Sequence, residues 1–134
     1  MIPVSPGELM DKMTILEIKR LRLTDKSQLT NVKFELALLD AVYRATIRPS
    51  FALDALNGRL ATVNQELWEA EDQIRQHERQ GSFGESFIRL ARSIYSKNDM
   101  RASIKREINL ILGSEILEEK SCGIIKGSNF QCDK

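Results

Sequence analysis

The residues most able to do chemistry lie between positions 92 and 105, where polar side chains follow one another at helical spacing. They are Arg92, Tyr95, Asn98, Asp99, Arg101 and Lys105. Arginine forks bind carboxylates and phosphates through two hydrogen bonds at once. If these side chains converge, the chemistry they favour is the binding of a small anionic molecule.

Two other interpretations of this stretch remain open. Apolar residues at helical spacing stop after Ile94 and resume at Ile104. Asn98 or Asp99 could cap a new helix with its side-chain oxygen, which would break the helix at that point. Alternatively, residues 95–105 could form a polar network between helices that only fixes their register. The sequence alone does not choose among the three.

A second dense group of charges lies at the start of the chain, and it includes Asp11 and Lys12 together with Glu8 and Lys19. The free backbone N–H groups at the start of a helix favour anions. We therefore add Asp11 and Lys12 to the candidate binding residues, on the expectation that the two polar groups meet in space.

Metal-binding patterns are weak. Glu66, Glu69 and Asp72 recur in steps of three on a predicted helix, as do the acids that hold magnesium in helical nucleotide hydrolases. A second acidic pair is needed on the next helix, which offers only the widely spaced Glu85, Asp99 and Glu107. We interpret the three acids as a solvated, salt-bridged face and expect no metal.

Catalytic groups are also scarce. His77 is the only histidine, and it lies where the apolar side of its predicted helix continues, so we expect a structural role. No serine or cysteine nucleophile stands in an arrangement typical of hydrolases. Trp68 and Tyr95 each follow a residue on the apolar side of a predicted helix. We therefore expect them to be aromatic residues at the edge of the core or in an interface. We expect no cofactor and favour a protein that is not an enzyme.

Composition bounds the protein class. A chain of 134 residues is the size of one domain, and 42% hydrophobic with 29% charged residues is typical of a soluble globular protein. The net charge of +1 argues against nucleic-acid binding, which requires a basic surplus. No stretch has the length of a membrane span and no secretory signal is present, so we expect a cytoplasmic protein in which Cys122 and Cys132 are free thiols.

The first half of the chain predicts a helical hairpin. A helix over residues 6–23 begins with a strong start signal, because Ser5 can cap it, Pro6 suits its first position and Glu8 completes a capping box. A second helix over residues 26–46 follows a short turn. Pro49 then stops it, since proline disfavours helical geometry in the preceding residue.

The second half predicts another hairpin. A long helix over residues 51–80 carries apolar residues in alternating steps of three and four, as coiled coils do, and Gly81 suits the position just past its end. A further helical region extends from 84 to 112, continuous or broken near Asn98. Residues 51–80 carry a net charge of -3 and residues 81–112 a net charge of +3, which favours antiparallel pairing.

Four segments stand together in an order that is typical of one family. They are SPGELMDKMTILEIK (5–19), ELWEAEDQIR (66–75), FIRLARSIYSKNDMRASIKREIN (87–109) and GSEILEEKS (113–121). Over about residues 4 to 121 the chain resembles a family of small uncharacterised helical bacterial proteins, a domain of unknown function. The resemblance implies no particular activity. Family members end soon after the last segment with an aromatic residue, whereas this chain continues through Cys122, so the tail is a poor carrier of any shared function.

We therefore predict an all-α domain over residues 1–120, with four or five helices in two antiparallel hairpins, and an extended or disordered tail over residues 121–134. The wide apolar helix faces exceed what one small bundle can bury, which favours self-association as a twofold dimer. The predicted function is a non-catalytic interaction or scaffold module that binds itself or another protein. The alternative is a metal-independent helical enzyme or binder that holds an anionic metabolite at residues 92–105.

Overall fold

The protein consists of four α-helices in the part of the chain that the structure describes. The structure is a computed structural model and describes the backbone of residues 4–124 and the side chains of residues 4–113. The helices are α1 (Pro6–Arg22), α2 (Lys26–Thr46), α3 (Phe51–Gln80) and α4 (Glu85–Ile124). The prediction of an all-α fold is confirmed.

The helix ends follow local capping signals. The Ser5 hydroxyl accepts a hydrogen bond from the backbone N–H of Glu8 at 3.2 Å, and the Asp25 carboxylate caps α2 in the same way. The Ser50 hydroxyl caps α3 through the N–H of Leu53. Gly81 ends α3 with a φ of 65°, a left-handed conformation that glycine adopts without strain.

The predicted possibility of a break near Asn98 is wrong, because α4 runs without interruption from Glu85 to Ile124. Asn98 and Asp99 are exposed within the helix and cap nothing. The helix also extends beyond residue 112, where the predicted helical region ends, and at 40 residues it is longer than α3 with 30. It includes residues 121–124 of the predicted tail; residues 125–134, with Cys132, lie outside the described residues, as does the side chain of Cys122.

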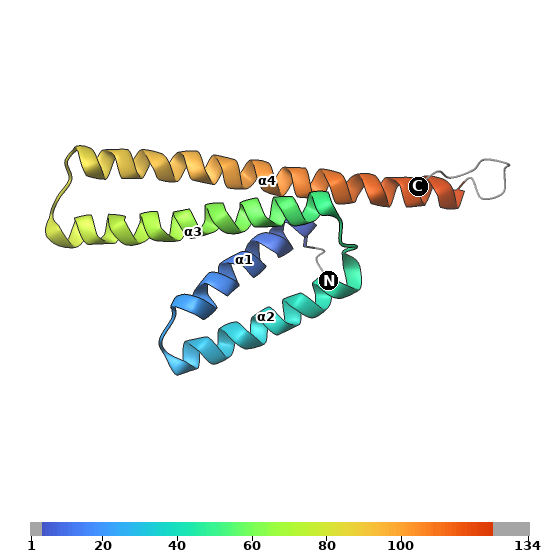
Figure 1. Ribbon diagram of the computed structural model, residues 1–134, viewed down its shortest axis with the longest axis horizontal. Helices are drawn as coiled ribbons and strands as arrows, with labels where there is room; N and C mark the ends of the chain where they lie inside the picture. The colour runs from blue at the N-terminus through green and yellow to red at the C-terminus, as the bar shows by residue number, and fades with distance from the viewer. Residues whose placement is uncertain (1–3, 125–134) are drawn as a thin grey trace.

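The helices form the two predicted antiparallel hairpins (Figure 1). Helices α3 and α4 lie side by side, and their opposite charges meet, since Lys97 binds Glu66 at 3.7 Å and Arg59 binds Glu107 at 3.5 Å. Helix α1 packs against α2, α3 and α4. Helix α2 lies at the edge of the molecule and packs on α1 (Figure 1). The first hairpin therefore joins the second through α1.

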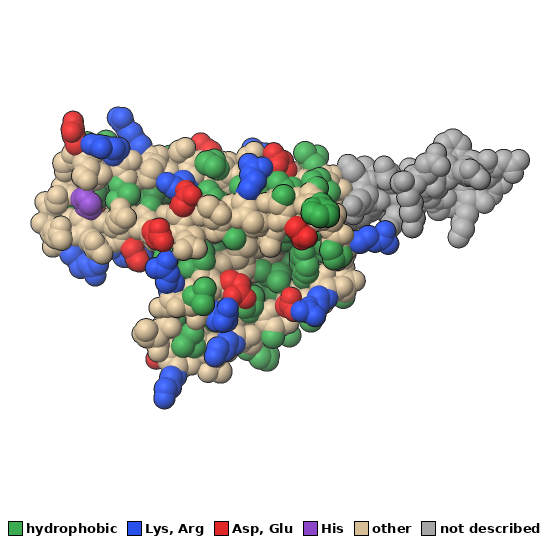
Figure 2. Space-filling model, viewed as in Figure 1, with side chains coloured by type: hydrophobic (Ala, Val, Ile, Leu, Met, Phe, Trp, Pro, Cys, Tyr) green, Lys and Arg blue, Asp and Glu red, His purple; other side chains and the backbone are tan. Residues whose placement is uncertain are grey.

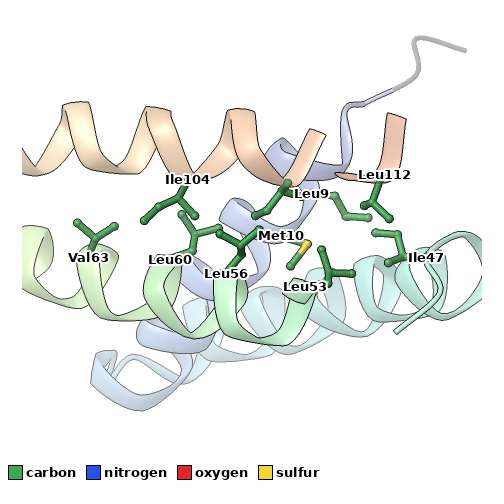
Figure 3. Close-up of a cluster of buried hydrophobic side chains, with 10 residues drawn as sticks. Leu9, Met10, Ile47, Leu53, Leu56, Leu60, Val63, Ile104 and Leu112 are labelled. Carbon is green, nitrogen blue, oxygen red and sulfur yellow. The ribbon is translucent and has the colours of Figure 1, made fainter. Parts of the chain in front are cut away.

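The hydrophobic core lies where α1 meets the first half of α3 and the second half of α4 (Figure 3). Met10, Leu53, Leu60, Ile104 and Ile108 have almost no exposed surface. Leu39 and Tyr43 of α2 also pack against this cluster. The core thus occupies one end of the long hairpin.

Helix α1 approaches α4 most closely at Gly7. A methyl group at this position would lie 2.7 Å from the backbone oxygen of Lys105, and the Gly7 N–H donates to the Asn109 side-chain oxygen at 2.7 Å. Backbone atoms of the two helices are therefore in contact at this point, and only glycine leaves room for that contact.

We predict that Gly7→Ala lowers the free energy of unfolding by about 2 kcal/mol, because the added methyl group forces α1 away from α4. Urea denaturation measures the change. Gly58→Ala is the matched control, since Gly58 is exposed within α3 and a methyl group there meets no atom within 4 Å. The control variant should gain up to about 1 kcal/mol. Equal effects of the two substitutions would contradict the close packing of α1 on α4.

Candidate functional site

A buried carboxylate organises the junction of three helices. Asp11 of α1 is only 3% exposed, on the side of the helix that faces α3 and α4. A buried charge is costly unless it is paired and hydrogen-bonded. The surroundings of Asp11 therefore decide whether α1 can pack there at all.

Helix α4 supplies the positive charges. Arg101 binds Asp11 through two parallel hydrogen bonds, from Nε to Oδ1 at 2.9 Å and from Nη2 to Oδ2 at 2.6 Å. Lys105, one turn further along, lies 3.6 Å from Asp11 Oδ2 and 2.6 Å from the Glu8 carboxylate. Arginine in this two-pronged geometry forms the strongest kind of side-chain hydrogen bond with a carboxylate.

Helix α3 completes the arrangement with one amide. Asn64 donates from Nδ2 to Asp11 Oδ1 at 2.9 Å and to the Thr14 hydroxyl at 2.7 Å. Thr14 in turn donates to the backbone oxygen of Asp11 at 2.7 Å. Among the described residues, no buried side-chain nitrogen or oxygen lacks a partner. We call Asp11, Thr14, Asn64, Arg101 and Lys105 the polar junction.

The charges of the junction reinforce each other. Burial raises the pKa of Asp11, but the hydrogen bonds from Arg101 and Asn64, with the charges of Arg101 and Lys105, outweigh it and leave that pKa below 3.8. The same ion pair raises the pKa of Arg101. Both groups are therefore charged at neutral pH.

The structure brings together three of the predicted binding residues, namely Asp11, Arg101 and Lys105. Lys12 points away from them and binds Glu35 of α2 at 2.7 Å. The other four, which are Arg92, Tyr95, Asn98 and Asp99, have exposed side chains on α4 outside the polar junction. Tyr95 alone is 74% exposed.

Three residues of this region were not predicted from the sequence, namely Thr14, Asn64 and Asn109. Asn64 had a readable signal, because it lies four residues after Leu60 and three before Leu67, on the apolar side of α3. A polar residue at such a position usually has a partner on another helix. Asn109 follows Lys105 by four residues and so extends the same side of α4, where it binds Gly7.

The other candidate residues have ordinary structural partners. Glu66, Glu69 and Asp72 bind Lys97, Arg22 and Arg75 respectively. The His77 ring lies 2.9 Å, through Nδ1, from the backbone oxygen of Gln73 and packs near Phe87. Trp68 is half-buried. Among the residues that the structure describes, no three potential metal ligands gather.

A groove of about 600 Å³ lies between α1, α2 and the start of α3. Its floor is apolar and includes Met10, Met13, Leu36 and Tyr43. Four of the charged residues at its edge are paired within their own helices, Arg20 with Glu17 at 2.9 Å and Arg44 with Asp40 at 2.9 Å. The pKa of Tyr43 is raised by burial and by the charges of Asp54 and Asp40.

The side of α2 that faces away from α1 is exposed and carries no charge. At about 100° per residue, consecutive positions over roughly 140° of the helix surface are uncharged. We call these positions the outer face of α2; they are Ser27, Thr30, Asn31, Phe34, Ala37, Leu38, Ala41, Val42 and Ala45, and all are exposed. Ala37, at the margin of this face, also lines the groove between α1 and α2. Phe34 is 68% and Leu38 53% exposed. Apolar side chains are visible along this part of the surface (Figure 2).

Fold and site together define an all-α protein of two antiparallel helical hairpins, joined by an ion pair whose carboxylate is buried. A family model matches residues 1–128, and the chain belongs to that family, DUF6165, a family of unknown function. No curated protein and no solved structure matches the chain at a significant level. No helix within residues 4–124 has the length and apolarity that a membrane span requires.

We predict that the stabilising effect of Asp11 disappears in acid. Because the native pKa of Asp11 is below its ordinary value of 3.8, the unfolded chain binds the proton first, and stability is lost as the pH falls through the native pKa. Asp11→Asn should therefore cost about 3 kcal/mol at pH 7 and progressively less below pH 4. Urea denaturation of both proteins between pH 7 and pH 3 measures this difference.

The control for the acid experiment is Asp99→Asn. This substitution also removes one carboxylate, but Asp99 is exposed on α4 and does not belong to the polar junction. It should change the free energy of unfolding by less than about 0.5 kcal/mol at every pH. A cost of Asp11→Asn that is the same at pH 7 and pH 3 would show that the charge of Asp11 contributes nothing.

Proposed function

We propose that the protein is a non-catalytic helical interaction module whose copies associate through the outer face of α2. The observation that carries this proposal is the exposure of that face. Neighbouring apolar side chains that are exposed together on a protein surface mark an interaction site. Helix α2 buries its inner side against α1, with Val32 buried and Leu39 and Tyr43 in contact with the core, and leaves Phe34 and Leu38 exposed on the other side.

The pattern of charge supports the same proposal. The charged residues of α2 lie on its inner side or its flanks, and three of them are already paired, Glu35 with Lys12 of α1 and Asp40 with Arg44. The centres of protein interfaces are depleted in charged residues and enriched in aromatic ones. The outer face of α2, with Phe34 near its middle, has this composition.

The polar junction supports a structural role better than the alternative of an anion site at residues 92–105. An anion that needs Arg101 must displace a buried carboxylate that is already bound in two-pronged geometry. Arg92 and Asn98 are exposed on the same helix and do not belong to the junction. Saturable binding of one phosphate or citrate per chain, lost on Arg101→Ala, would favour the alternative.

We predict that molar mass, measured by light scattering over about 5 to 300 μM, rises from that of one 15.3 kDa chain towards twice that value. Leu38→Asp places a charge at the centre of the outer face of α2 and should hold the protein at the mass of one chain, with little change in melting temperature. Ile88→Asp is the matched control, because Ile88 is 48% exposed on α4 and lies outside α2; it should associate like the wild type.

Wild-type protein that keeps the mass of one chain at every concentration would contradict the proposal. So would an equal loss of association in the Leu38→Asp and Ile88→Asp proteins, since the effect would then not depend on α2.

A further inference from the structure

We infer that the outer face of α2 fits a second copy of itself in antiparallel orientation, with Phe34 of one copy against Ala45 of the other. This inference rests on the proposed self-association and adds the occupant, its direction and its register. The middle line of the face is the row of positions that runs along its centre, and the sizes and order of the side chains on this line differ between its two ends.

Two large residues are followed by two small ones along this line. Phe34 and Leu38 are one helical turn apart, and so are Ala41 and Ala45, and all four lie within roughly 60° of each other around the helix axis. A twofold axis between residues 39 and 40 places Leu38 opposite Ala41 and Phe34 opposite Ala45. Every large side chain then meets a small one, which lets the two helices approach closely and pack without voids.

Parallel pairing gives the opposite result. It places Phe34 against Phe34 and Ala45 against Ala45, so the helices are held apart at one end and leave a gap at the other. An antiparallel pair about a twofold axis is also the isologous arrangement that most small homodimers use. The order of large and small residues therefore favours one direction.

Charge is consistent with burial of this face against an identical one. Lys33 and Asp40, on the inner side of α2, point away from the middle line by more than roughly 100°. Identical faces with charges near their centre would repel one another, whereas this face brings only Ser27, Thr30 and Asn31 as polar groups to its edge. Thr30 already donates its hydroxyl hydrogen to the backbone oxygen of Lys26.

The available area predicts a weak dimer. An aromatic side chain buries roughly 150–250 Å², and Phe34 is 68% exposed. With Leu38, Val42 and the small residues, the face offers on the order of 500 Å² per copy, which is about 1,000 Å² for the pair and lies at the lower edge of specific interfaces. We therefore expect a dissociation constant of about 1–100 μM.

Cysteine cross-linking tests direction and register. Two proteins, Phe34→Cys and Ala45→Cys, are prepared with Cys122 and Cys132 replaced by serine, mixed at about 200 μM and oxidised gently. Mass spectrometry distinguishes the mixed disulfide from the two symmetric ones. In the antiparallel register the mixed pair is adjacent, whereas residues 34 of two copies are about 16 Å apart along the axis, too far for a disulfide.

The expected result is a mixed disulfide in at least tenfold excess over either symmetric one. Leu38→Cys mixed with Ala41→Cys should also give the mixed disulfide, but without the tenfold excess, because residues 38 of the two copies are only about 4.5 Å apart along the axis. A symmetric disulfide from Phe34→Cys alone would overturn the direction and show parallel pairing. Dimers by light scattering with no cross-link at these positions would overturn the interface while leaving self-association intact. Protein with the mass of one chain throughout would instead overturn the proposed function itself.

Discussion

The packing of the first hairpin on the second depends on the charge of Asp11. A carboxylate that is 3% exposed must have its partners in place before α1 can be buried. Those partners come from two other helices, Asn64 of α3 and Arg101 of α4, so the charge is satisfied only when α1 lies against both. Apolar contacts would favour burial of α1 in many positions along α3 and α4, whereas the two-pronged ion pair can form in only one of these positions. Gly7 adds a second constraint one turn earlier, where only a residue without a side chain fits against the backbone of α4.

The packing of α1 against the other helices determines which helix surface stays exposed. Helix α1 packs against all three other helices, whereas α2 packs mainly on α1 within the described residues and lies at the edge of the molecule (Figure 1). The side of α2 away from α1 is apolar and uncharged, yet nothing in the described chain covers it. The stable part of the molecule and the proposed interaction surface are thus separated. The polar junction holds the hairpins together, and the outer face of α2 stays available for a partner.

The first three helices could be predicted from the sequence nearly to the residue, because Ser5, Pro49 and Gly81 are local signals that act within one turn of their own position. The continuity of α4 could not be predicted. The apolar pattern pauses near Arg101 since that residue faces α1 and not the apolar side of α3, and only the packing of a third helix supplies its partner. Asp11 and Arg101 are 90 positions apart in sequence. The sequence identified both as candidates for one site, but spacing alone does not tell whether a charge awaits a ligand or is already bound within the chain.

The most direct test of this account is a double-mutant cycle on Asp11 and Arg101, with the free energy of unfolding of Asp11→Ala, Arg101→Ala and the double variant measured at pH 7 and one protein concentration. Arg101→Ala leaves the buried Asp11 carboxylate without its main partner and should cost about 3 kcal/mol, whereas Asp11→Ala leaves the partly exposed Arg101 unpaired and should cost about 2 kcal/mol. The double variant should cost less than the sum by about 2 kcal/mol or more, because it removes both charges together. Single and double effects that simply add would contradict the claim that this ion pair holds the two hairpins in register.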